Sequence, residues 1–118
     1  MAFSFLGLFS CKGYKDLTVN EFETMLTQDQ TVQLVDVRTP EEFNENHIPG
    51  ALNIDWRGEG FSEKARTQLD PQRPVMVYCR SGRRSAEAAA TLDGIGFKTY
   101  NMKGGILAWT AAGKRVTK

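Results

Sequence analysis

Short apolar segments alternate with helical patterns along most of this chain, and this alternation constrains the fold more than any other feature of the sequence. Residues 31–37, 74–78 and 98–101 have the composition of β-strands. The first two are almost continuously apolar, as in strands that are buried on both faces of a sheet. Strands that alternate with helices favour an α/β domain with a parallel sheet and helices on both of its faces.

Helix signals occupy the segments around these strands. Thr18 and Glu21 have the spacing of a capping box, in which each side chain bonds to the backbone N–H of the other residue, and they predict a helix after Thr18. Pro40 is suited to the first turn of a helix and predicts a short one over residues 41–45. The remaining predicted elements are a short strand at 52–54 and helices at 61–69, at 85–92 and from Gly104-Gly105 through Trp109.

The composition excludes several classes of protein. The chain has 118 residues, the length of one domain, and its 41% hydrophobic and 25% charged residues argue against intrinsic disorder. Its net charge of +1 gives no indication of nucleic-acid binding. One histidine and two distant cysteines do not fit a structural zinc site. No apolar run reaches about 18 residues, so we expect no transmembrane helix.

The beginning of the chain differs in character from the rest. Residues 2–10 form an apolar run that ends at Cys11, somewhat like the end of a bacterial lipoprotein signal. No Lys or Arg precedes the run, which is short for a signal core, and Phe9 is bulky for that motif. We expect residues 1–16 to be an N-terminal apolar segment, either flexible or a signal remnant. We also expect a cytoplasmic protein, with a periplasmic location or a lipid anchor on Cys11 as the alternative.

Cys79 lies at the carboxyl end of a predicted strand, where ligands bind in parallel sheets. The loop after it is short and polar, and Gly82 permits a tight turn whose backbone N–H groups can surround an anion. Three of the five residues 80–84 are arginines. These features favour a thiolate and attract an anionic substrate, whereas an ordinary buried cysteine with solvated arginines is the alternative. No nearby histidine supplies a base, so these surroundings have to activate the sulfur.

Four blocks of the sequence resemble the rhodanese homology domain, here the family of single-domain sulfurtransferases. The blocks are residues 34–43, 47–54 and 77–85, and Gly104-Gly105 followed by Trp109. Together they span roughly residues 17–113, nearly the whole chain. The resemblance implies that residues 17–118 form a rhodanese-like three-layer α/β domain with a central five-stranded parallel sheet.

The same resemblance implies a reaction. In this family a nucleophilic cysteine takes the sulfane sulfur of thiosulfate or of a persulfide and passes it to a thiophilic acceptor such as cyanide or a protein thiol. The implied partners are a small anionic sulfur donor and a thiol or protein-thiol acceptor, with no nucleic acid. The family needs no cofactor and no metal, and we expect a monomer for a chain of this size.

Carried over to this sequence, the resemblance makes Cys79 the sulfur carrier, with the backbone N–H groups of residues 80–84 as its cradle. The implied substrate-binding residues are Arg80, Ser81, Gly82, Arg83 and Arg84. We expect the side chains of Arg80 and Arg83 to face the substrate. Arg84 completes the family's C-x-x-G-x-R pattern, and either contacts the substrate or turns inward to hold the loop, with Asp36 as its suggested partner.

Other polar residues are expected to have supporting or structural roles. Asp36 and Arg38 end the strand at 31–37 on the same side of the sheet as Cys79, and either orient the loop or substrate or form a structural ion pair. We interpret Glu42 as part of an exposed helix start, favoured by the helix dipole. His47 belongs to a turn that the family uses structurally, and Trp109 is expected to be a packing residue.

Three other functions stay open at this point. A rhodanese-like domain can be a non-enzymatic binding or regulatory module. A cysteine-dependent phosphatase or arsenate reductase has a C-x5-R loop and needs an arginine at position 85, where this chain has Ser85, so that Arg84 closes a shorter loop. A redox protein would pair Cys11 with Cys79, but the sequence has no C-x-x-C motif.

Overall fold

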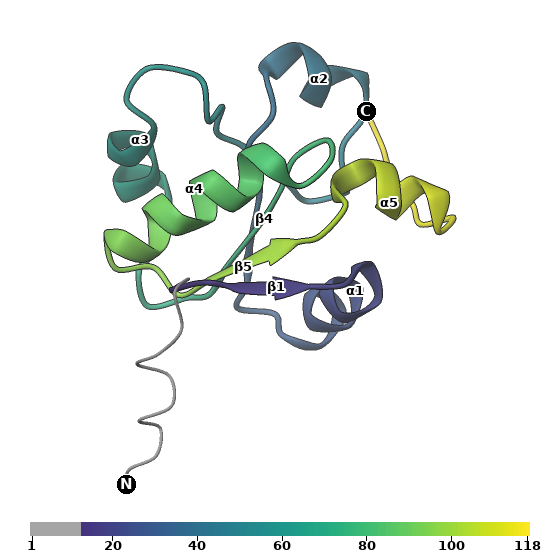
Figure 1. Ribbon diagram of the computed structural model, residues 1–118, viewed down its shortest axis with the longest axis horizontal. Coiled ribbons are helices and arrows are strands. Elements are labelled where there is room, and N and C mark those ends of the chain that lie inside the picture. Colours follow the sequence, from purple (N-terminus) through teal and green to yellow (C-terminus); the bar gives the residue numbers. More distant parts are fainter. Residues whose placement is uncertain (1–12) are drawn as a thin grey trace, which may run out of the picture.

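Five parallel strands form one central sheet in the computed structural model, which describes residues 13–118 (Figure 1). The strands are β1 (Lys15–Leu17), β2 (Gln33–Asp36), β3 (Leu52–Asn53), β4 (Val75–Tyr78) and β5 (Thr99–Met102). Their order across the sheet is β1-β5-β4-β2-β3, and every neighbouring pair is parallel. The predicted α/β fold with a five-stranded parallel sheet is therefore confirmed.

Helices cover both faces of this sheet and complete a three-layer structure. They are α1 (Val19–Gln28), α2 (Pro40–Glu45), α3 (Phe61–Gln68), α4 (Arg83–Gly94) and α5 (Gly105–Ala111). Residues of α3 and α4 pack in one core with Val75 and Val77 of β4, whereas residues of α1 and α5 pack in a second core with Met76 and Tyr78. Because successive residues of a strand point to opposite faces, the central strands are apolar on both.

Two capping boxes start the helices at the predicted places. The Glu21 N–H donates to Thr18 Oγ1 (3.1 Å) and the Thr18 N–H to Glu21 Oε1 (2.9 Å), which starts α1. Thr39 and Glu42 form the same box at α2, with Pro40 in its first turn. These local bonds satisfy backbone N–H groups that have no partner within the helix.

The sequence prediction missed β1 and placed the start of α4 too late; β2 also starts two residues later than the predicted 31–37, and α5 continues two residues past Trp109. β1 was not predicted, because three residues are too few to show a strand period, and it is defined by its pairing with β5. α4 begins at Arg83, two residues before the predicted start at 85, because Gly82 adopts a left-handed φ of 104° and begins the helix. Arg83 and Arg84 therefore lie in the first turn of α4.

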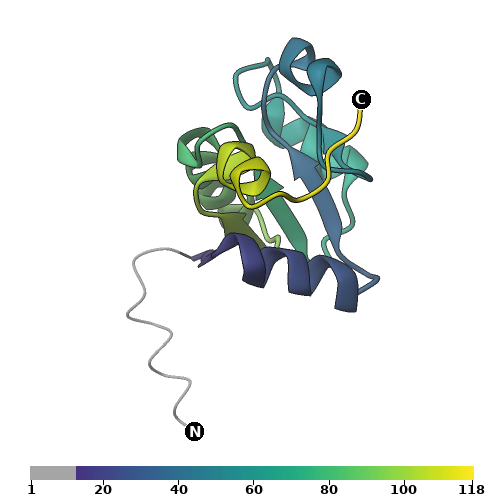
Figure 2. The ribbon, with the colours of Figure 1, turned by 90° about the vertical axis from the view of Figure 1, so that its right-hand side faces the viewer.

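The chain ends near α2 (Figures 1 and 2). After α5 the last residues run toward α2, where His47 and Thr117 form an antiparallel bridge. Residues 2–10 and Cys11 are outside the described residues, and with them the signal and lipid-anchor alternatives. From residue 13 to residue 118, no helix has the length and apolar character to cross a membrane.

The start of α5 is packed against the loop that follows β4. The N–H groups of Ile106 and Leu107 donate to the carbonyl oxygens of Cys79 (2.9 Å) and Arg80 (3.1 Å). Gly105, with a φ of 62°, directly precedes Ile106, and a Cβ atom there would be 2.6 Å from the Cys79 carbonyl oxygen and closer still to that of Arg80. Only glycine allows this approach, which fixes one side of the loop.

We expect Gly105→Ala to lower the free energy of unfolding by about 3 kcal/mol, since it adds a steric overlap to an unfavourable backbone conformation. Gly113→Ala is the matched control, because Gly113 also has a positive φ (78°) but open space around its Cβ position. Its cost should be about 1 kcal/mol. Urea unfolding followed by circular dichroism measures both, and equal losses would contradict the steric argument.

Candidate active site

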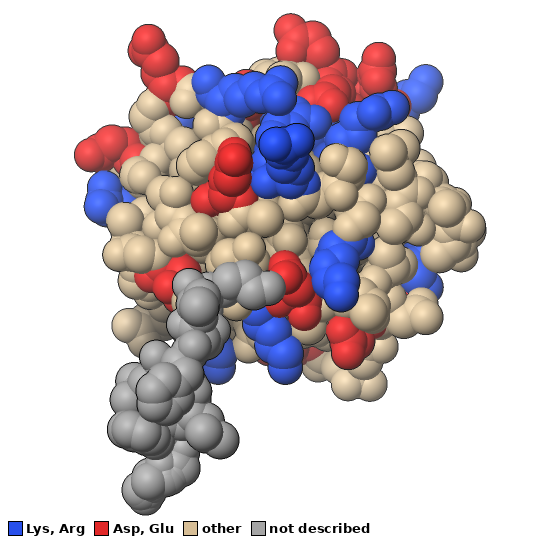
Figure 3. All heavy atoms as spheres, in the orientation of Figure 1, with Lys and Arg blue, Asp and Glu red and all other residues tan. Residues whose placement is uncertain are grey.

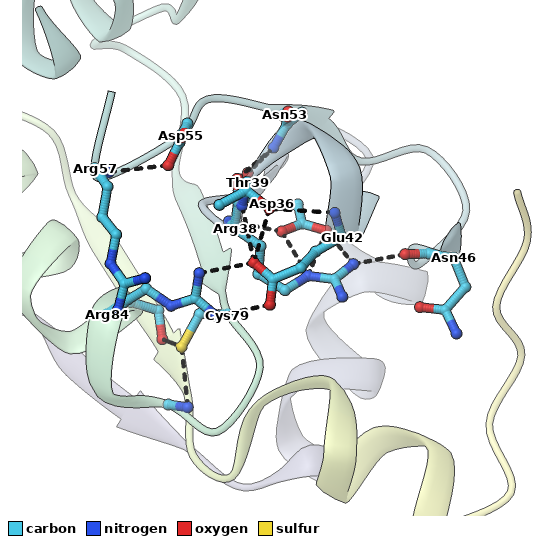
Figure 4. Close-up of polar contacts among 12 residues, drawn as sticks. Asp36, Arg38, Thr39, Glu42, Asn46, Asn53, Asp55, Arg57, Cys79 and Arg84 are labelled. Atoms are coloured by element: carbon cyan, nitrogen blue, oxygen red, sulfur yellow. Dashed lines mark hydrogen bonds and ion pairs between the residues drawn. The ribbon is translucent and has the colours of Figure 1, made fainter. Parts of the chain in front are cut away.

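The sulfur of Cys79 lies between the end of β4 and the start of α4, and Cys79 is only 1% exposed. Its Sγ accepts a hydrogen bond from the Gly82 N–H at 3.0 Å and from the Ser85 hydroxyl at 3.4 Å. Figure 4 shows the two hydrogen bonds as dashed lines that meet at the Cys79 sulfur. A sulfur atom that accepts two hydrogen bonds is well placed to carry negative charge.

The first turn of α4 adds positive potential to this position. A helix N-terminus carries partial positive charge, which acidic residues in the first turn commonly offset. In α4 the first turn contains Arg83 and Arg84 and no acidic residue. Arg80, Ser81 and Arg83 are exposed, whereas Arg84 is partly buried. The surroundings of the sulfur therefore favour an anion from both the backbone and the side chains.

Arg84 turns inward and forms a two-point ion pair with Glu42 of α2 (Figure 4). The two nitrogen–oxygen distances are 2.8 and 3.0 Å. Hydrogen bonds from Arg84, acting against the effect of burial, lower the pKa of Glu42 to about 2. The suggested pairing of Arg84 with Asp36 is thus wrong. Glu42 lies at the start of a helix as predicted, but it is partly buried and paired rather than exposed.

Asp36 is paired with Arg38 instead, at the end of β2. Both side chains are buried, with 2.7 Å between Arg38 Nη2 and Asp36 Oδ2. Arg38 also donates to the carbonyl oxygen of Asn46 (2.6 Å) and thereby ties β2 to the segment after α2. Across residues 13–118 neither side chain has a hydrogen bond or ion pair with the Cys79 loop. Of the two predicted roles, the contacts are those of a structural ion pair.

His47 and Trp109 make structural contacts. The His47 ring stacks on Phe43, with ring centroids 3.8 Å apart, and its Nδ1 lies 2.9 Å from the Phe43 carbonyl oxygen. Trp109 is buried, and its Nε1–H donates to the carbonyl oxygen of Arg115. Both residues therefore have the packing roles that the sequence suggested.

Two residues at the site escaped the sequence analysis, Ser85 and Glu42. Ser85 reaches the sulfur because α4 begins at Arg83, which puts Ser85 in its first turn; a helix start at Gly82 was the missing signal. Glu42 was treated only as a helix-start residue. Its capping position in α2 could be predicted from the sequence, but the approach of α2 to Arg84 arises only in the folded chain.

A comparison with known families identifies this arrangement. The family model described as Rhodanese-like domain matches residues 18–112, most of the chain. The chain belongs to the rhodanese-like domain family. The C-x-x-G-x-R loop, from Cys79 to Arg84, lies within the matched region.

Individual relatives support a rhodanese-type sulfurtransferase. The putative sulfurtransferase YtwF of Bacillus subtilis is 38% identical over 95 residues, which are 80% of this chain and 89% of that protein. The thiosulfate sulfurtransferase GlpE of Shewanella oneidensis is 38% identical over 100 residues, 84% of this chain and 95% of that protein. The solution structure of the polysulfide-sulfur transferase homodimer from Wolinella succinogenes superposes with a TM-score of 0.73 at 28% identity, covering 89% of this chain and 79% of that one.

We expect Glu42→Gln to lower the free energy of unfolding at pH 7 by about 1–2 kcal/mol, since the ion pair is lost while glutamine can still cap α2. A carboxylate whose pKa is lowered by folding stabilises the protein above its unfolded pKa, near 4.5, and this contribution disappears as the pH falls toward about 2. The difference between wild type and variant should therefore shrink over that range.

Glu41→Gln is the matched control, because Glu41 is the exposed neighbour in the same helix. It should change stability by less than about 0.5 kcal/mol at every pH. Urea unfolding at pH 7, 4 and 2.5 checks both variants. A Glu42→Gln difference that stays constant with pH would contradict the ion-pair explanation.

Proposed function

We propose that this rhodanese-like domain moves a sulfane sulfur from thiosulfate or a persulfide donor to a thiophilic acceptor through a persulfide on Cys79. The observation that carries the proposal is the buried Cys79 sulfur with hydrogen bonds from Gly82 and Ser85 at the start of α4. Such surroundings favour the thiolate, which is the nucleophile that sulfur transfer requires. The sulfurtransferase names of the relatives support the same reaction type.

In the loading step, the Cys79 thiolate attacks the outer sulfur of thiosulfate. A new S–S bond forms, the S–S bond of thiosulfate breaks, and its electron pair leaves with sulfite. The backbone N–H groups of Ser81 and Gly82 would receive the outer sulfur of the resulting persulfide. Exposed guanidinium groups of Arg80 and Arg83 would attract the dianion and stabilise the charge of the departing sulfite.

The ion pair of Arg84 supports the assignment of the substrate contacts to Arg80 and Arg83. Its charge is offset by Glu42, whereas Arg80 and Arg83 form no ion pair with any residue in 13–118. Lys and Arg side chains gather over the part of the surface where Figure 1 shows the loop before α4 (Figure 3). Arg80 and Arg83 are therefore cations available to a small anionic donor.

In the discharge step, an acceptor thiol or cyanide attacks the outer sulfur and releases the Cys79 thiolate. Neither step calls for a metal or an organic cofactor.

We propose a monomer that acts in the cytoplasm; the periplasm, or a membrane surface reached through a lipid on Cys11, is the alternative. Intact mass of the protein purified from its own cells would distinguish a lipidated chain from an unmodified one.

We expect the intact mass of the wild type to rise by about 32 Da, one sulfur atom, after incubation with thiosulfate, and to return to its starting value after cyanide is added. Cys79→Ser should gain nothing while keeping its fold, because the attacking sulfur is missing. Cys11→Ser is the matched control and should gain the same mass as the wild type. A gain on Cys79→Ser would remove Cys79 from the mechanism.

If the wild type takes no sulfur from thiosulfate, the experiment is repeated with glutathione persulfide. Loading from glutathione persulfide alone would mean that a persulfide is the donor. A wild-type chain that takes no sulfur from either compound is a binding module rather than an enzyme.

We expect Arg80→Ala to lower kcat/KM for thiosulfate about tenfold or more, the effect of losing one charge-assisted hydrogen bond. The loss should be smaller with glutathione persulfide, because that donor releases no sulfite. Arg66→Ala is the matched control, since Arg66 lies on α3 and pairs weakly with Glu63 at 3.9 Å. Thiocyanate formation with the two donors measures the effect. Equal losses with both would mean that Arg80 acts on the thiolate rather than on the oxyanion.

A further inference from the structure

Ser85 is a polar residue on the apolar side of α4. The buried residues of this helix are Ser85, Ala88, Ala89 and Leu92, and Ser85 is 0% exposed. Alanine would pack equally well in such a position, and a buried hydroxyl costs free energy unless it is hydrogen-bonded. Its only hydrogen bond among the described residues is to Cys79 Sγ, at 3.4 Å. The hydroxyl therefore interacts specifically with this sulfur.

The charge of the sulfur decides how much that bond is worth. A neutral thiol is a weak acceptor, whereas a thiolate accepts strong, charge-assisted hydrogen bonds. Ser85 gains most when Cys79 Sγ carries a full negative charge. In the proposed cycle this charge is present before loading, is absent from Sγ in the persulfide, and returns during discharge.

We propose that Ser85 is a catalytic residue, whose hydroxyl donates to Cys79 Sγ while that atom leaves as a thiolate in the discharge step. This inference rests on the proposed function. The acceptor, cyanide in the simplest case, attacks the outer sulfur, and a carbon–sulfur bond forms. The bond between the outer sulfur and Sγ breaks, and its electron pair goes to Sγ, so that thiocyanate and the Cys79 thiolate are the products.

The difference in burial between Ser85 and Gly82 indicates which sulfur atom of the persulfide each hydrogen-bond donor contacts. Ser85 is fully buried and reaches Sγ from the inner side, whereas Gly82 is partly exposed and belongs to the loop that faces solvent. Both hydrogen bonds to the Cys79 sulfur are drawn as dashed lines in Figure 4. The outer sulfur has to lie where an acceptor can reach it, on the side of the loop. The Ser85 hydroxyl therefore stays with the inner sulfur, which is the leaving group.

This position makes the two half-reactions respond differently to loss of the hydroxyl. During loading, the hydrogen bond already stabilises the thiolate before it attacks, so its removal changes the barrier little once the thiolate is formed. During discharge, the bond strengthens as charge develops on Sγ and stabilises the transition state more than the persulfide. A residue with a merely structural role would not separate the two steps.

The test compares single-turnover rates of Ser85→Ala with those of two other variants, all in a Cys11→Ser background that leaves Cys79 as the only thiol. The protein is loaded with thiosulfate or glutathione persulfide, the donor is removed, and thiocyanate is followed after cyanide is added. We expect Ser85→Ala to discharge about 10- to 100-fold more slowly. Its loading rate at high pH should change by less than about threefold.

Thr99→Val is the matched control, because it also removes a buried hydroxyl, one that donates to the Phe97 carbonyl oxygen at 3.0 Å. It should discharge at the wild-type rate. Ser85→Thr keeps the hydroxyl and should recover most of the rate lost in Ser85→Ala. A Ser85→Ala rate within about twofold of the Thr99→Val rate overturns the inference.

A second measurement needs no sulfur donor. The ultraviolet absorbance of the Cys79 thiolate, followed as the pH is raised, should appear at higher pH in Ser85→Ala than in Thr99→Val. If the wild type takes no sulfur from either donor, the proposed function fails, yet this titration still tests the bond between Ser85 and the anionic sulfur. Identical titrations of the two variants contradict the role of Ser85.

Discussion

Burial of the Cys79 sulfur at the start of α4 is the constraint on which the rest of the site depends. A buried anion is unfavourable unless hydrogen bonds and dipoles replace the water that it has lost. Gly82 contributes a backbone N–H, Ser85 a hydroxyl, and α4 the positive end of its dipole. The N-terminus of α5 donates hydrogen bonds to the carbonyl oxygens of Cys79 and Arg80, which holds the loop with the Gly82 N–H directed at the sulfur.

The charged side chains at this end of the sheet form two groups, those that are held in ion pairs and those that are not. Asp36 and Arg38 are buried and satisfy each other, and the pair stiffens the end of β2 without reaching the sulfur. Arg84 and Glu42 join α4 to α2 and are partly buried. Breaking either pair would leave an uncompensated charge in a poorly solvated position. The unpaired arginines of the loop, Arg80 and Arg83, are exposed where an anion would arrive.

The sequence predicts the features of this structure that depend on neighbouring residues. Two helix starts are specified locally, one by the capping box of Thr18 and Glu21 and the other by Pro40 after Thr39. The apolar runs at 31–37 and 74–78 specify buried strands. The prediction of Cys79 in an anion-binding loop also depended on local signals, a strand followed by a glycine and arginines.

Features that depend on tertiary contacts could not be predicted in the same way. β1 has three residues and is recognisable only beside β5. The partner of Arg84 is 42 residues away in sequence, and Asp36 at the end of β2 is also acidic, so charge alone could not decide between the two carboxylates. Ser85 has no sequence pattern that links it to Cys79; the left-handed Gly82 that begins α4 brings the two together.

The packing of α5 against the loop has a consequence for how this protein can be observed. The hydrogen bonds of this contact join backbone atoms, and the close approach depends on the lack of a side chain at Gly105. Leu107 donates its N–H to the Arg80 carbonyl oxygen, yet the residue is 46% exposed. A fluorescent or spin label attached at this position would lie beside the loop without filling it. Such a label could follow each turnover in real time through the changing charge nearby.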